Sequence, residues 1–185
     1  MSSTGENTFD PFADRLARDI RNSLSTAMVA SLQRGNRGDF RDCCRRWLRR
    51  DPPLPHRRYI EQRSLAFEAL FADVRTARTT DPLLLAVRLW NAGLFFEVHE
   101  VVEKCWQNAS GKRRTALKGL VQAAGSYVHR EAGHVRAAQR LAEKAAAHLG
   151  ASHEALGEIA NIKELVSCLQ RAAAKAPHLA YDTAA

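Results

Sequence analysis

The stretch of residues 91–106 holds the densest set of side chains that could do chemistry. In a helix, its apolar side chains would form one seam with a histidine in the middle: Phe95, His99, Val102 and Trp106. Glu103 follows His99 by one turn, so the imidazole and the carboxylate can hydrogen-bond or share a metal ion. Glu100, the next residue after His99, is expected to be angled away. The spacing therefore predicts a polar pair on an apolar helix face.

Three interpretations of this pair follow from its residue types. His99 and Glu103 could be a mutually satisfied buried pair that fixes helix register, since a buried polar group without a partner costs about 1–3 kcal/mol. They could instead line a ligand or metal pocket, or act in acid–base catalysis. The string HExxE is similar to the HExxH of zinc proteases, but the motif supplies no third ligand, so it does not indicate a protease.

A second row of polar side chains lies further along the chain, at the i, i+4 and i+7 positions of a predicted helix over 113–131: Gln122, Ser126 and His129. This row borders the apolar face of the same helix, so Gln122 and His129 either take part in helix packing or line a pocket with His99 and Glu103. With His129 added, the set would be two histidines and one carboxylate. Zinc and non-haem iron are bound by such sets.

The apolar periodicity predicts an all-α fold, because no run of β-branched residues alternates with period two. Eight helices are expected, near 11–33, 39–50, 57–79, 82–92, 94–108, 113–131, 135–149 and 153–175. Gly93 separates the fourth from the fifth, so these two should form a tight antiparallel hairpin that carries the histidine. The expected architecture is a multi-helix bundle.

Three prolines within residues 51–55 break the helical pattern and predict a boundary there. We expect an N-terminal helical arm over 1–58 and a helical bundle over 59–185. The arm helix near 39–50 has a short apolar seam with Trp47 as its anchor. Such a seam must dock on the body of the protein or on a second copy, so a homo-oligomer is among the expected partners.

Positive charge is concentrated in the arm. The chain carries a net charge of +8, and residues 34–58 hold nine Arg against three Asp. Arg41, Arg45 and Arg49, with Arg46, should face outward from the arm helix. This strip is either a solvated surface or a weak contact for nucleic acid or another polyanion.

Composition places the chain among ordinary globular proteins. It has 185 residues, of which 45% are hydrophobic and 26% are charged. The four cysteines form no CxxC pair, which favours reduced thiols over a zinc knuckle or a disulfide scaffold. No membrane segment or secretory signal is evident, so a cytoplasmic location is expected.

The central region resembles a bacterial and archaeal family called domain of unknown function 309. The family's hallmark is HxxxExxW, matched by His99, Glu103 and Trp106. Further matching positions fall in order: Asn91, Gly93, Phe95, Phe96, Glu97, Glu100, Lys112, Gly119, Leu120, Gln122, Ala123, Ala124 and His129. The resemblance covers about residues 59–150. It implies an all-helical domain with a metal-binding function and no assigned reaction.

Two hypotheses of different classes remain. In the first, which we favour, the protein is a non-enzymatic small-ligand or metal-binding module, or an interaction module, centred on His99 and Glu103. In the second, a divalent metal on His99, Glu103 and His129 activates water, with Glu100 or Glu97 as general base, in a hydrolase-like reaction. Zinc or iron would be the metal in either case.

Overall fold

The computed structural model describes residues 8–77 and 81–182, with the side chains of 74–77 left aside. This part of the chain contains eight α-helices and one short 3-10 helix, and no β-strand beyond a single isolated bridge between Ile159 and Tyr181. The all-α prediction is confirmed. By packing, the chain divides into two compact units, Met1–Arg78 and Thr79–Ala185.

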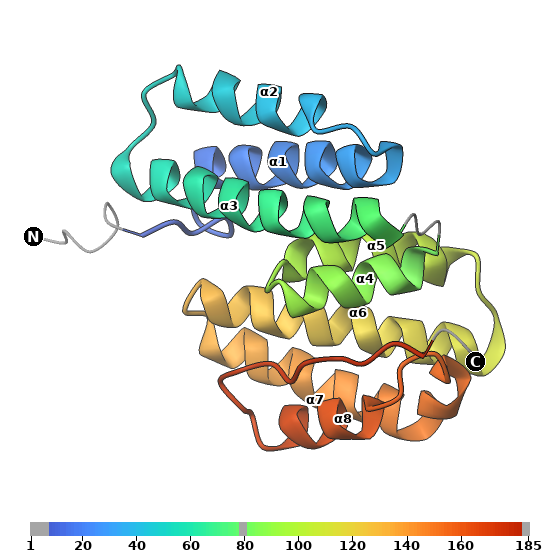
Figure 1. The fold of residues 1–185 in the computed structure, drawn as a ribbon. Helices are drawn as coiled ribbons and strands as arrows, with labels where there is room; N and C mark the ends of the chain where they lie inside the picture. The colour runs from blue at the N-terminus through green and yellow to red at the C-terminus, as the bar shows by residue number, and fades with distance from the viewer. Residues whose placement is uncertain (1–7, 78–80, 183–185) are drawn as a thin grey trace, which may run out of the picture. The chain divides into compact units, whose positions relative to one another are not determined.

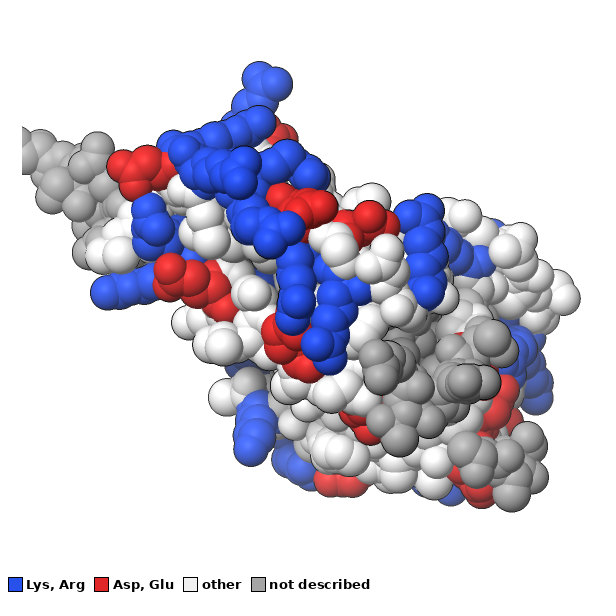
Figure 2. Space-filling model, turned by 45° about the horizontal axis from the view of Figure 1, so that its top comes forward, with Lys and Arg blue, Asp and Glu red and all other residues white. Residues whose placement is uncertain are grey.

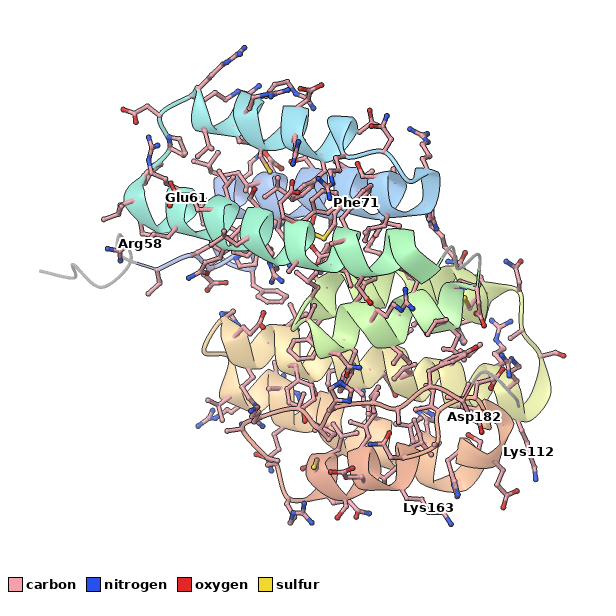
Figure 3. The ribbon with its side chains drawn as sticks, viewed as in Figure 1. Arg58, Glu61, Phe71, Lys112, Lys163 and Asp182 are labelled. Atoms are coloured by element: carbon pink, nitrogen blue, oxygen red, sulfur yellow. The ribbon has the colours of Figure 1, made fainter. Side chains whose placement is uncertain are left out.

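The first unit is a three-helix assembly of α1 (Arg15–Arg34), α2 (Gly38–Leu48) and α3 (Leu54–Ala77). Each of these helices packs against the other two (Figure 1). Its core is made of fully buried apolar side chains, and the rings of Phe40 and Phe67 lie with centroids 4.3 Å apart. Phe71, labelled on α3 in Figure 3, is also buried. The seam of α2 thus docks within its own chain.

Helix α1 begins at Arg15, later than the predicted start near residue 11. Asp10 accepts a hydrogen bond from the Phe12 amide and closes a turn, whereas Asp14 is the N-cap and accepts from the Leu16 amide at 2.8 Å. Asp14 also binds the buried His56 of α3 at 2.6 Å. The carboxylate of Asp14 therefore has two roles: one oxygen caps the start of α1, and the other binds His56.

The proline-rich turn is internal to the first unit. The units divide at 78/79, because α3, which follows the prolines, packs on α1 and α2. All four cysteines are free thiols, as predicted. None of the helices described here combines the length and hydropathy that spanning a bilayer requires.

The second unit begins with α4 (Pro82–Asn91) and α5 (Phe95–Gln107), the predicted hairpin. Gly93 between them has φ +71°, a left-handed conformation that glycine adopts without strain. The chain continues through α6 (Gly111–Glu131) and α7 (Val135–Ser152), and each helix packs on the next (Figure 1).

The single helix predicted over 153–175 is wrong. A 3-10 helix, η1 (His153–Leu156), is followed by a turn and then by a shorter helix, α8 (Ile162–Gln170). The interruption is explained by backbone hydrogen bonding: the Ala160 amide donates to the Ala180 carbonyl at 3.0 Å, and not to the carbonyl four residues earlier as in a continuous helix. The side-chain amide of Asn161 also binds the backbone of His178 and Ala180. Periodicity alone did not reveal this long-range contact.

Helices α6 and α7 form the closest helix pair of the second unit. At Gly119 an added Cβ would lie 2.8 Å from Leu149 Cγ and 3.1 Å from His148 Cβ, so only glycine permits this approach. One turn on, Gln122 Oε1 accepts a hydrogen bond from His148 Nδ1 at 2.7 Å. Gly119 and Gln122, two of the positions that carry the family resemblance, therefore lie at the α6–α7 seam.

Candidate metal-ligand cluster

Helix α5 brings three ligand-type side chains together at one place on its surface. The distance from His99 Nδ1 to Glu100 Oε1 is 3.6 Å, and to Glu103 Oε2 it is 3.8 Å. One ligand atom from each of the three residues lies within 4.8 Å of the other two. The predicted proximity of His99 and Glu103 is confirmed. We call these three residues the α5 cluster.

The expectation that the pair is largely buried is wrong. The side chains of His99, Glu100 and Glu103 are 33%, 38% and 38% exposed. The reason is the placement of the apolar face of α5, whose buried positions include Phe95, Val98, Val101 and Val102 and leave the histidine at its edge. The Nδ1 atom of His99 is nevertheless buried, and no hydrogen-bond partner for it lies within the described residues.

Glu100 was expected to be angled away from His99 and was not among the predicted metal ligands. Adjacent helix residues point about 100° apart, which suggested that Glu100 faces away from His99. A glutamate side chain is long enough to reach back, and here its carboxylate is slightly closer to Nδ1 than that of Glu103. The signal in the sequence was the doubled acid of HExxE, which offers two carboxylates within one turn.

The donor set suits a divalent metal. Zinc binds imidazole nitrogen and carboxylate oxygen at about 2.0–2.2 Å, so two ligand atoms on one ion lie at most about 4 Å apart. Both distances from Nδ1 to the carboxylates already fall within this limit. An imidazole nitrogen that is buried without a hydrogen bond has a lone pair or proton that a partner would satisfy. The α5 residues therefore fit a metal ion.

The contacts of the two predicted residues on α6 are with α7 and with its N-cap residue. Gln122 is directed to α7, where it binds His148. His129 is near the C-terminal end of α6, with its ring centroid 5.8 Å from that of His134, and it is not one of the three clustered ligand residues. Ser126 is buried and donates to the Ala123 carbonyl at 2.7 Å.

The motif aromatics occupy different environments. Phe95 is buried against Trp90 and Tyr127, with ring centroids 5.1 and 5.0 Å away. Phe96 is half-buried and lies parallel to the His99 ring, with centroids 6.1 Å apart. Trp106 is also half-buried, beneath the guanidinium of Arg114 at 5.1 Å from the ring centroid. Phe95 is thus part of the core, and Phe96 lies beside the cluster histidine.

A comparison with protein families matches the central part of the chain. The model of the family DUF309, a domain of unknown function, matches residues 83–141, from α4 into α7. Residues 83–141 form a DUF309 domain. The α5 cluster and the α6–α7 seam at Gly119 both lie inside it. The match is shorter than the resemblance expected over 59–150, and the first unit lies outside it.

The other two comparisons gave no match, neither among curated proteins nor among solved structures. Within the DUF309 domain, His99, Glu103 and Trp106 occupy one face of α5 at the spacing HxxxExxW. The DUF309 name itself assigns no activity. Any function must therefore be argued from the cluster.

Proposed function

We propose that the protein is a metal-binding module whose α5 cluster holds a divalent cation. The observation that carries the proposal is the placement of His99 Nδ1, a buried nitrogen with no hydrogen bond, within 3.8 Å of two carboxylates. His99 would supply the nitrogen ligand, and Glu100 and Glu103 would supply oxygen ligands. The open coordination positions would face solvent, since all three side chains are about one-third exposed.

The types of ligand atom limit which divalent cations this cluster would bind. One imidazole with two carboxylates suits zinc, iron(II) or manganese(II), whereas calcium and magnesium prefer all-oxygen sets. Two carboxylates beside a neutral imidazole carry a charge of −2, which a divalent cation neutralises. Zinc is the first choice, because it accepts mixed nitrogen and oxygen ligands without a preferred geometry.

The proposal concerns binding and not turnover. A hydrolase that used His129 as a third protein ligand would need that side chain in the α5 cluster, and the group of clustered ligand residues does not include it. Three ligands from one helix already complete the protein contribution to a zinc site with an open position.

The test is metal binding by the full chain, purified without a histidine tag and treated with a chelator. Isothermal titration with Zn²⁺ should give one site, and Co²⁺ should give visible absorption bands that report nitrogen and oxygen coordination. His99→Ala and Glu103→Gln should each weaken binding by at least tenfold, the effect typical of losing one ligand.

His178→Ala is the matched control, because this histidine is exposed and contributes only its backbone carbonyl to the structure. It should leave the titration unchanged. Equal binding by wild type, His99→Ala and Glu103→Gln would reject the α5 cluster as the metal site. Absence of a Co²⁺ spectrum in wild type would reject metal binding by this cluster altogether.

A further inference from the structure

The basic residues of the first unit are all of one kind. Residues 1–78 contain fifteen Arg and no Lys, whereas the rest of the chain contains seven Arg and six Lys. Arginine presents a planar fork of donors that matches phosphate oxygens in pairs, and it is less strongly hydrated than lysine. Its exclusive use here favours recognition of a phosphate group over a mere need for positive charge.

Ion pairs within the unit neutralise some of these arginines. Arg41 binds both carboxylate oxygens of Glu68, at 2.7 and 2.9 Å, and Arg37 lies 3.7 Å from the same group. The pKa of Glu68 is lowered by the hydrogen bond from Arg41. Arg34 and Arg57 are paired with Asp39 and Asp51. Of the predicted strip, Arg41 is therefore committed to an internal partner.

The outward face of α2 keeps an excess of positive charge. Arg45, Arg46 and Arg49 are exposed there and surround a single acid, Asp42. Arg45 forms an ion pair with Asp42, and the pKa of Asp42 is lowered by that hydrogen bond and by the charges of all three arginines. Figure 2 shows that blue side chains crowd this region of the first unit, with few red ones among them.

We propose that this arginine face, Arg45, Arg46 and Arg49, binds the phosphate backbone of double-stranded nucleic acid. The rise between Arg45 and Arg49 is four helical residues, or about 6 Å, so both can reach phosphates of one strand. Arg46 and Arg49 make no close ion pair within the described part of the chain, and their donors remain available for a ligand.

The local surroundings favour a duplex over a single strand. Single strands are held by aromatic rings that stack on exposed bases. The aromatic side chain on α2 nearest to this face, Trp47, is covered by the guanidinium of Arg50 at 4.5 Å and donates its indole N–H to Ser23 at 2.7 Å. The Trp47 ring therefore has no open face on which a base could stack. The arginine face would contact backbone phosphates only, and such binding does not depend on the base sequence.

The surroundings also disfavour a membrane surface. Peripheral helices enter the lipid headgroup region through an exposed apolar face. The apolar face of α2 is already used, because Phe40, Cys43 and Cys44 are buried inside the unit. Only charge would then attract this face to a lipid surface. A duplex offers, in addition, phosphates at a fixed spacing, and we therefore favour the duplex.

Binding of the full chain to a labelled duplex of about 20 base pairs, followed by fluorescence anisotropy at several salt concentrations, tests the proposal. The double variant Arg46→Gln/Arg49→Gln should bind about tenfold more weakly and should lower the slope of log K against log salt by about two. Asp42→Asn should change affinity in the opposite direction, because it removes the one acid among the three arginines.

The control is Arg136→Gln/Arg140→Gln on α7, which removes the same charge from two exposed positions one turn apart. It should retain wild-type affinity and slope. Equal loss in both double variants would overturn the arginine face as the site. Tighter binding of wild type to a single strand, to anionic vesicles or to polyglutamate than to the duplex would overturn the assignment of the ligand.

Discussion

The side chain of Asn91 forms hydrogen bonds with both backbone groups of Leu179, the N–H and the C=O. The side-chain amide of Asn91 donates to the Leu179 carbonyl, and its carbonyl oxygen accepts from the Leu179 amide, both at 2.8 Å. The neighbouring Trp90 donates its indole N–H to the Pro177 carbonyl at 2.8 Å. The last helix turn of α4 thus binds the backbone of residues 177–179, and Leu179 is buried.

Asn91→Ala should release this segment. Two hydrogen bonds are lost, and we expect the free energy of unfolding to fall by about 1–3 kcal/mol. The measurement is urea unfolding, together with amide exchange at Leu179, which should accelerate. Asn108→Ala, which removes one exposed hydrogen bond at the end of α5, is the control and should cost less than about 1 kcal/mol. Unchanged exchange at Leu179 would contradict the role of Asn91.

Gly119→Ala should destabilise the second unit. The new methyl group would overlap Leu149 Cγ, which is near the root of its side chain and cannot swing away freely. Overpacking of this kind costs about 1–3 kcal/mol, more than the roughly 1 kcal/mol that alanine gains over glycine in a helix. The melting temperature should fall, and Leu149→Ala in the same chain should restore part of the packing at α6–α7.

Gly150→Ala is the matched control for that substitution. Gly150 lies in α7, has no left-handed φ, and would meet nothing within 4 Å. Alanine there should raise stability by about 0.5–1 kcal/mol through helix propensity alone. If both variants were stabilised equally, the close approach at Gly119 would not matter energetically.

Glu158 should contribute to stability at neutral pH and not in acid. Arg113 donates to its carboxylate at 2.7 Å, and this hydrogen bond lowers the pKa of Glu158 below its usual 4.5. A lowered pKa in the folded state means that the contribution is present above the unfolded pKa and is lost as pH falls through the folded one. Protonation therefore weakens the folded protein.

Glu158→Gln should accordingly lower the free energy of unfolding by about 0.2–1 kcal/mol near pH 7, since the pair is partly exposed. The difference between variant and wild type should shrink toward zero as the pH falls through the lowered pKa of the folded-state carboxyl. Urea unfolding at about pH 7 and at a series of lower pH values measures this. A difference that grows on acidification would have the wrong sign for this pair.

Phe40→Ala should destabilise the first unit more than Trp47→Ala. Phe40 is fully buried against Phe67, whereas Trp47 is half-buried and holds Ser23 through its N–H. We expect a loss of about 3–5 kcal/mol for Phe40→Ala and less for Trp47→Ala. Trp47→Phe, which keeps a ring and removes the hydrogen bond, should cost about 0.5–1.5 kcal/mol. The reverse order in thermal unfolding would make Trp47 the anchor, as the sequence suggested.

The helices were predictable from sequence because their signals are local. The Gly93 hairpin, for example, combines a glycine with apolar periodicity on both sides, and α4 and α5 formed as predicted. The end of the chain was not predictable in this way. Asn91 binds Leu179, and Asn161 binds His178 and Ala180, across long sequence separations, and hydrogen bonds of that kind leave no periodic pattern.

The candidate site was predictable in part, for the same reason. His99 and Glu103 lie one turn apart on a helix, so their proximity follows from geometry. The position of Gln122 depends on which face of α6 meets which neighbour, and here its amide turns to His148 of α7. The burial of His99 was predicted wrongly, because an apolar helix face does not indicate how exposed a residue at its edge is.

The α5 cluster draws all of its ligands from residues 99–103, within little more than one helical turn. A cation bound there would act as a clip across a single turn of α5, joining no two elements and closing no long loop. Its binding energy would oppose fraying of this helix and leave the rest of the unit untouched. Loading with metal should thus register as slowed amide exchange confined to α5, and a short peptide spanning that turn should already show some affinity.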